Sequence, residues 1–203
     1  MRLKLACALA AVLAASTLPA VAESPWGVQQ ATGVTSGDRP VRSSSQYRRS
    51  DKSPVPRATV NYESKHAPGT IVVNTAERRL YYTLGNGKAI RYGVGVGRDG
   101  FTWSGTHSVT RKAEWPGWTP PATMIRREAA KGRKLPAYMP GGPENPLGAR
   151  ALYIGSTIYR IHGTNQPWTI GQAMSSGCIR MANEDVIHLY NQAGVGTRVV
   201  VVR

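Results

Sequence analysis

From residue 67 onward, the chain consists of short runs rich in β-branched and aromatic residues, separated by turns that contain glycine. Runs of this kind are typical of β-strands. Gly85-Asn86-Gly87 and Gly155-Ser156 each stand between two such runs, and each therefore predicts a hairpin turn. We expect strands at 70–74, 78–84, 88–97, 150–155, 157–162 and 197–203.

Two segments have the pattern of short helices. One lies near 123–132 and ends at a glycine. The other follows Asn183, a residue type favoured as N-cap, with Glu184 and Asp185 placed where acidic side chains favour a first turn. Its apolar face would consist of Val186, Ile187 and Tyr190. Closely spaced strands with one or two short helices predict a mostly β fold, either a β-sandwich or an open barrel.

The first 22 residues have the pattern of a signal peptide. Arg2 and Lys4 precede an apolar run over 5–18, and Ala20-Val21-Ala22 is a small-residue cleavage site. The run is shorter than the roughly 20 apolar residues that span a bilayer. We therefore expect an exported protein of the periplasm or cell wall that does not span the membrane.

Residues 23–66 differ from the rest of the chain in composition. They are rich in serine, arginine and proline and lack apolar periodicity, so they bury too little surface to offset the entropy of ordering. We interpret 23–66 as a linker and 67–203 as one domain of ordinary size.

The formal net charge of +15 suits either anionic partners or simply a solvated basic surface, and charge alone does not choose between them. Export makes nucleic acid an unsuitable partner and favours the carboxylates and acidic polymers of a cell wall. The sequence contains no HxH, CxxC or HExxH pattern, so we expect neither a metal site nor another cofactor.

Cys178 is the only cysteine left once the signal peptide is removed. Composition leaves two readings open, a reactive thiol or a small buried residue. His162 ends a predicted strand and is followed by Gly163, whereas Cys178 lies in the small-residue sequence SSGC. An imidazole beside a thiol favours the nucleophilic thiolate, and backbone N–H groups at Gly177 and Cys178 would be placed to hold an oxyanion.

The stretch IHGTNQPWTIGQAMSSGCIRM, residues 161–181, resembles the signature of the L,D-transpeptidase catalytic domain (YkuD-type) family. That signature is an HG element followed by SxGC, an apolar residue and Arg or Asn. IVVNTAERRLYY, YGVGVG, WPGWTPP, LPAYMPGGPENPLGARALY and the final GTRVVVV extend the resemblance over most of 67–203.

The resemblance implies a role for each matched position. Cys178 would be the nucleophile, His162 the base that activates it, and the Gly163 carbonyl the group that orients the imidazole. Arg180 would pair with a substrate carboxylate. Ser176 stands where many members of the family carry a second histidine.

The resemblance also implies a reaction. Cys178 would attack the bond between the third residue of a peptidoglycan tetrapeptide stem and its terminal D-Ala, and an amine would resolve the thioester. The acceptor would be a second stem (crosslinking the wall), an outer-membrane protein or lipoprotein (anchoring it), or water (carboxypeptidase or hydrolase action). Acylation by carbapenems is also implied. Two rival readings remain: a non-catalytic wall-binding module, and a protein that uses Cys178 for an intermolecular disulfide.

Three further features are left open by the sequence. Trp115, Trp118 and Trp168 suit either a substrate groove or core and loop packing. The turn-rich stretch 140–148 resembles a lid over the site. The glycine run 93–97 lacks the lysine and following helix of a phosphate loop, so we expect close strand packing there.

Overall fold

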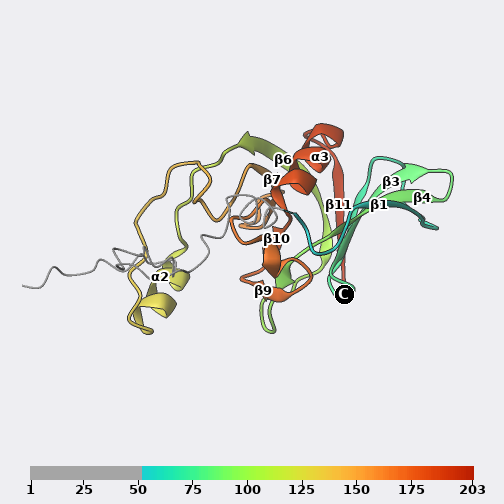
Figure 1. The fold of residues 1–203 in the computed structure, drawn as a ribbon. Helices are drawn as coiled ribbons and strands as arrows, with labels where there is room; N and C mark the ends of the chain where they lie inside the picture. The colour runs from blue at the N-terminus through green and yellow to red at the C-terminus, as the bar shows by residue number, and fades with distance from the viewer. Residues whose placement is uncertain (1–51) are drawn as a thin grey trace, which may run out of the picture. The chain divides into compact units, whose positions relative to one another are not determined.

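The structure, a computed structural model, describes residues 52–203 (Figure 1). The predicted signal peptide and residues 23–51 of the predicted linker lie outside the described residues. Within 52–203, no helix is long and apolar enough to cross a membrane.

The described residues form a mixed sheet of nine strands and a separate pair of two strands. The larger sheet has the order β1-β4-β3-β2-β11-β6-β7-β8-β10, and β5 pairs with β9. The predicted mostly β fold is therefore confirmed. The strands are β1 Ala58–Asn61, β2 Ile71–Asn74, β3 Arg79–Gly85, β4 Lys88–Gly93, β5 Val96–Gly97, β6 Gly105–Glu114, β7 Arg150–Ile154, β8 Arg160–His162, β9 Ala173–Ser175, β10 Ile179–Arg180 and β11 Arg198–Val202.

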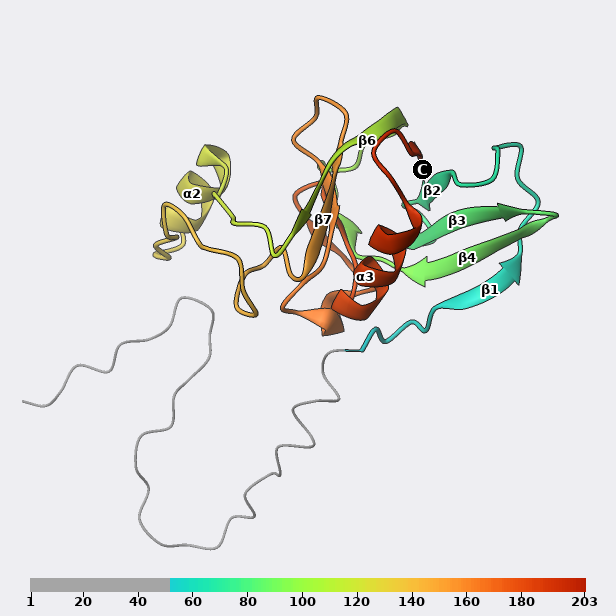
Figure 2. The same ribbon diagram turned by 90° about the horizontal axis from the view of Figure 1, so that it is seen from above.

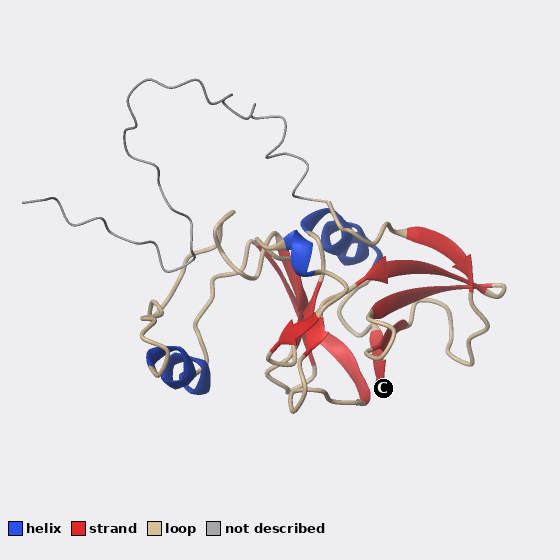
Figure 3. Ribbon diagram, turned by 60° about the horizontal axis from the view of Figure 1, so that its bottom comes forward, coloured by secondary structure: helices blue, strands red, loops and turns tan. Residues whose placement is uncertain are grey.

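The ten-residue strand β6 belongs to both halves of the larger sheet. Its first part pairs with β11 through residues 105–108, and its second part pairs with β7 through residues 109–114. The register shifts between Val109 and Arg111, which is where a bulge bends a strand. Figure 3 shows the resulting two groups of strands.

One hydrophobic core lies between the two groups of strands. Strands β2, β3, β4 and β11 contribute one side of it, and β7, β8 and β10 contribute the other. Helix α3, Asn183–Gln192, lies beside β7 and adds Val186 and Leu189 to the core (Figure 2). The core residues from the strands include Ile71, Val73, Leu80, Tyr92, Leu152, Ile154, Ile161, Ile179, Val199 and Val201.

Several stretches differ from the expected strand pattern, and β6, β9 and β10 form where no strand was expected. The run expected as one strand at 88–97 divides after Gly93, because β4 stays in the large sheet while β5 pairs with β9. Residues 58–61, inside the expected linker, form β1 and pair with β4. The alternating burial of β1 is that of an edge strand with one covered face, a pattern too short to stand out from its polar surroundings.

The predicted glycine packing is confirmed at 93–97. A Cβ added at Gly97 would lie 2.3 Å from the Phe101 carbonyl oxygen and 3.3 Å from Cα of Gly177. Only glycine therefore allows β5 to approach the segment that carries Cys178 so closely.

A long excursion, residues 115–149, connects β6 to β7 and carries helix α2, Ala122–Ala129 (Figure 1). The helix overlaps the predicted segment 123–132, beginning one residue earlier and ending three residues earlier, and it has no buried residues. Reciprocal backbone hydrogen bonds of 2.8 Å between Trp118 and Met139 close the base of the excursion. The arrangement of α2 is therefore set by this closure and by polar contacts instead of by core packing.

An ion pair joins the segment before β1 to helix α3. Arg57 Nη1 lies 3.1 Å from Oδ1 of Asp185, whose side chain is 2% exposed, and Oδ2 has no partner among the described residues. Burial is the main cause that raises the pKa of Asp185 to about 6, and the charge of Arg57 acts in the opposite direction. Folding therefore favours the protonated carboxyl group.

We expect Asp185 to make folding less favourable as the pH rises. Its pKa is raised from the ordinary value of about 3.9, so its stabilising effect is complete below about pH 4 and is lost as the pH passes through about 6. Between about pH 4 and about pH 7, the free energy of unfolding should decline less in Asp185→Asn than in the wild type. The difference between the two declines should be about 3 kcal/mol at most. Urea unfolding of both proteins at several pH values measures the difference.

Glu144→Gln is the control, because Glu144 is exposed and is not among the charges that act on Asp185. This change should leave the pH dependence close to that of the wild type. Parallel stability curves for wild type and Asp185→Asn would contradict the prediction.

Candidate active site

The loop that carries Cys178 is held by hydrogen bonds from Ser175, within the loop segment, and from Trp103, which lies far away in the sequence. Ser175 Oγ donates to the Cys178 carbonyl at 2.6 Å and accepts from the Gly177 N–H at 3.1 Å. Trp103 Nε1 donates to the Gly177 carbonyl at 2.8 Å, and the Trp103 ring stacks on Tyr159 with centroids 4.6 Å apart. These contacts fix the loop from its core side.

Gly177 is required at its position for two reasons. Its φ of 108° is rarely adopted by residues with a Cβ, and an added Cβ would lie 2.3 Å from Cε1 of Tyr159. Any side chain would push the loop off the aromatic ring. The glycine of SSGC is thus a backbone requirement that places Cys178.

Two pairs between parallel strands bring His162 and Arg180 to the same face. In β8 and β10, Ile161 pairs with Ile179 and His162 with Arg180. The isoleucines are buried in the core, so the alternation of a strand turns His162 and Arg180 to the opposite face. Cys178 directly precedes β10, two residues before Arg180, and its charge acts on the Arg180 guanidinium.

His162 is buried, with 4% exposure, and its Nδ1 lies 2.6 Å from the Gly163 carbonyl oxygen. Because a carbonyl only accepts, Nδ1 carries the proton and Nε2 is the free lone pair. The Gly163 carbonyl therefore lies where the resemblance placed it.

The imidazole is neutral in the resting site. Burial is the largest cause that lowers the pKa of His162 to about 3, followed by the positive charge of Arg180. The Gly163 carbonyl opposes this shift, the charge of Arg160 adds to it, and a backbone contact with Leu147 opposes it. Leu147 belongs to the stretch 140–148, so that stretch packs against the histidine.

Arg180 is a largely buried cation. Burial lowers the pKa of its guanidinium, and the neighbouring charge of Cys178 acts in the opposite direction. Among residues 52–203, the carboxylates in ion pairs are those of Asp185, Glu128 and Glu114, and none of them pairs with Arg180. A buried charge without a counter-ion is costly and is characteristic of a binding site for the opposite charge.

The sequence suggested Asn183 as the N-cap of α3, but the structure shows that it is not. Ala182 takes that position without a side-chain cap, and Asn183 is the first helical residue. Its Oδ1 instead accepts from the N–H groups of Ala149 at 3.0 Å and Thr164 at 3.2 Å. A capping residue type thus fastens the chain on both sides of the site.

Ser176 contacts the excursion. Nη2 of Arg127, on α2, lies 3.4 Å from Ser176 Oγ, and Arg127 also contacts Glu128, which Lys131 and Arg133 contact as well. The sequence gave no reason to associate Arg127 with Ser176. The only related feature of the sequence is the group of basic residues in and after α2, which indicates a positively charged segment but not its contact with Ser176.

The three tryptophans named from the sequence lie in different settings. Trp118 is 7% exposed, Trp115 is 44% exposed and Trp168 is 60% exposed. In the stretch 140–148, Asn145 is buried and donates to the carbonyls of Met139 and Pro140. The lid role of that stretch stays a prediction.

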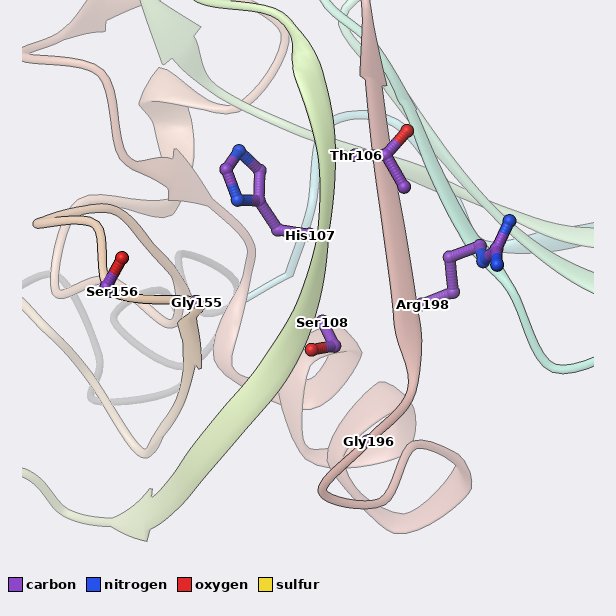
Figure 4. Close-up of a pocket in the computed structure, with 7 residues that line it drawn as sticks. All are labelled: Thr106, His107, Ser108, Gly155, Ser156, Gly196 and Arg198. Carbon is purple, nitrogen blue, oxygen red and sulfur yellow. The ribbon is translucent and has the colours of Figure 1, made fainter.

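A separate polar pocket lies between β6, the β7–β8 turn and β11 (Figure 4). The ring of His107, on β6, meets Trp103 edge-on at 5.7 Å between centroids. Neither Cys178 nor His162 lines this pocket, so it is distinct from the candidate active site. Its lining residues are Thr106, His107, Ser108, Gly155, Ser156, Gly196 and Arg198.

Within residues 52–203, no group of three His, Cys, Asp or Glu side chains is arranged to hold a metal ion. The groups at the candidate site that can take part in a reaction are the free thiol of Cys178, the neutral imidazole of His162 and a guanidinium group without an ion pair, that of Arg180. This set suits acyl transfer through a cysteine nucleophile.

Comparisons with known proteins agree with this class of site. Residues 68–201 match the L,D-transpeptidase catalytic domain, YkuD. The chain belongs to the L,D-transpeptidase catalytic domain family.

Curated relatives share this part of the chain. "Probable L,D-transpeptidase YbiS" of Escherichia coli is 46% identical over 134 residues, which are 64% of this chain and 43% of that protein. "Probable L,D-transpeptidase ErfK/SrfK" of the same organism is 44% identical over 137 residues, which are 65% of this chain and 43% of that protein. The match thus spans less than half the length of these relatives.

The fold also has solved counterparts. An L,D-transpeptidase from Mycobacterium smegmatis superposes with a TM-score of 0.52 at 16% identity, over 68% of this chain and 59% of that one. At this identity the likeness concerns the fold.

We expect Asn183→Ala to destabilise the fold by about 2 to 4 kcal/mol, because two backbone N–H groups lose their acceptor. Urea unfolding measures the loss. Asn191→Ala, an exposed position on the same helix, is the control and should change stability by about 0.5 kcal/mol or less. Equal effects of the two changes would show that the Asn183 contacts contribute nothing.

We expect Arg180→Gln to raise the pKa of His162 from about 3 toward its ordinary value, since a positive charge that disfavours the imidazolium is removed. Arg160→Gln should raise it less, because Arg160 is a smaller cause of the shift. Arg180→Lys keeps the charge and is the control. NMR titration of the His162 ring measures all four proteins, and an unchanged pKa in Arg180→Gln would refute the assignment.

Proposed function

We propose that the chain is an exported L,D-transpeptidase that acts on peptidoglycan tetrapeptide stems. The observation that carries the proposal is the shared face of β8 and β10, which carries a neutral imidazole and a half-buried arginine without an ion pair, directly next to the only free thiol of the described residues. Membership of the family supports the reaction class.

In the first half-reaction, Cys178 Sγ attacks the carbonyl carbon of the third stem residue while Nε2 of His162 takes the thiol proton. The carbon–nitrogen bond to D-Ala then breaks, and the imidazolium returns the proton to the departing amine. A thioester on Cys178 and free D-Ala are the products. Because Gly177 N–H already donates to Ser175, we assign the oxyanion to the Cys178 N–H.

Arg180 couples substrate binding to this proton transfer. Its charge lowers the pKa of His162, and a substrate carboxylate bound to its guanidinium would neutralise that charge. The imidazole therefore becomes a better base when a carboxylate is bound than when the site is empty. Arg180 would thus both bind the substrate and limit activation of the thiol to the complex.

In the second half-reaction, an amine attacks the thioester carbonyl, its proton passes to His162, and the thiol of Cys178 is restored. A second stem gives a crosslink, an N-terminal or lysine amine of an outer-membrane protein or lipoprotein gives an anchored protein, and water gives carboxypeptidase action. Export to the periplasm or cell wall is part of the proposal and rests on the pattern of residues 1–22.

The test uses the mature protein and Cys178→Ala with a disaccharide-tetrapeptide as donor, followed by mass spectrometry of protein and products. We expect D-Ala release and a thioester adduct with the wild type and neither with the variant. A donor that ends at the third residue should give no adduct, since it lacks the bond to be broken.

Adding an amine should divert the thioester to a new amide and thereby identify the acceptor class. A carbapenem should add its mass to the wild type and leave Cys178→Ala unchanged. If wild type and variant bind sacculi equally and neither releases D-Ala, the wall-binding reading replaces the enzyme. If the wild type instead forms a dimer that a reducing agent separates, the protein uses Cys178 for an intermolecular disulfide and the enzyme reading is replaced.

A further inference from the structure

A row of large side chains crosses the sheet beside Cys178. Across β6, β7 and β8, Arg111 pairs with Tyr153 and Tyr153 pairs with Arg160. Paired residues point to the same face of a sheet, so these three side chains form one line. On β8, Arg160 is two residues before His162 and shares its face. Cys178 directly precedes β10, whose first residue, Ile179, pairs with Ile161, the neighbour of Arg160.

The two arginines of this row stack on the tyrosine. Cζ of Arg111 lies 3.5 Å from the Tyr153 ring centroid, and Cζ of Arg160 lies 5.4 Å from it. Stacking uses the flat face of a guanidinium and leaves the N–H groups at its edge available. Tyr153 thus orients both guanidinium groups without occupying their donors.

No carboxylate neutralises this row within the described part of the chain. Neither Arg111 nor Arg160 takes part in the ion pairs of residues 52–203. Arg160 Nε is buried and has no hydrogen-bond partner there. A buried donor without an acceptor calls for an explanation, and an anionic ligand on the same face supplies one.

The spacing of the row defines the kind of ligand. Adjacent strands lie about 4.8 Å apart, so Arg160 is one strand from Cys178 and Arg111 is three strands away, about 14 Å. An extended peptide advances about 3.5 Å per residue, so a tetrapeptide is long enough to cover the row. A carboxylate held by Arg160 would lie one or two residues from a carbonyl positioned at the thiol.

We propose that Arg160, supported by Tyr153 and Arg111, is a second carboxylate subsite, which binds the acyl-donor peptide through a free carboxylate on its second residue. Arg160 is a specificity-determining residue, distinct from Arg180. The inference rests on the proposed function, because the donor is the stem peptide whose bond Cys178 attacks.

The test compares two donors, one with a free carboxylate at the second residue and one with a carboxamide in its place. D-Ala release is measured over a range of donor concentrations. Wild type should show at least about 10-fold higher kcat/KM for the carboxylate donor, the size of effect expected when one charge-assisted contact is lost. Arg160→Gln should lose this preference through a higher KM for the carboxylate donor, and Arg160→Lys should retain part of it.

Arg198→Gln is the matched control, because Arg198 is exposed on β11, away from this row. It should keep the preference of the wild type. Thermal unfolding of each variant checks that the fold is intact, and the comparison of the two donors on the wild type needs no variant.

Each other outcome has a defined meaning. Equal kcat/KM of the wild type for both donors would overturn the subsite, and so would a preference that survives in Arg160→Gln. If Arg160→Gln changed only transfer to an added amine and left D-Ala release intact, the row would serve the acceptor and the donor assignment would be wrong. Absence of D-Ala release from either donor in the wild type would instead refute the proposed function.

Discussion

The pairing of β8 with β10 is the contact on which the candidate site depends. It contains two pairs, Ile161 with Ile179 and His162 with Arg180. The isoleucines are buried in the core, and this burial decides which face receives the other pair. A slip of one residue would turn the isoleucines outward and the imidazole into the core, so the hydrophobic effect protects the register of the site.

Uncompensated positive charge is the second property that organises the site. Arg180 and Arg160 both disfavour the imidazolium form of His162, and neither has a carboxylate partner among residues 52–203. The empty site is therefore electrostatically unfavourable, and an anionic ligand relieves the repulsion while it raises the basicity of the histidine. Recognition of the ligand and activation of the thiol thus use the same charges.

The sequence predicted the residues of the candidate site that lie close together along the chain. It did not predict those that come together only because their strands pair in the sheet. Cys178, His162, Gly163 and Arg180 fall within one stretch of 161–181, so a linear motif contains them. Arg111, Tyr153 and Arg160 come from three strands, and their common line depends on a register that includes a bulge in β6.

Sequence-based predictions were wrong where contacts between distant residues outweighed the local preference of a residue type. The residue type of Asn183 favours a cap, yet its side chain is drawn to backbone groups at Ala149 and Thr164 because those groups would otherwise be left without an acceptor. Strand β1 pairs through only four residues, so its pattern is hidden in a polar segment. Strands β2 and β11 were predictable because continuous β-branched runs suit only a buried position, whereas the largely polar sequence of β6 concealed the longest strand of the sheet.

The contacts that support the thiol come from the core side of the sheet. Ser175 and Trp103 hold the loop, and Tyr159 requires the glycine before Cys178. Helix α2 reaches the same loop only through Arg127, at 3.4 Å from Ser176, and buries none of its own residues. An element with so few buried contacts opens at low free-energy cost, whereas the core-side contacts do not. The loop that carries the nucleophile is therefore held mainly by Ser175, Trp103 and Tyr159, and α2 adds a long hydrogen bond from Arg127 to Ser176.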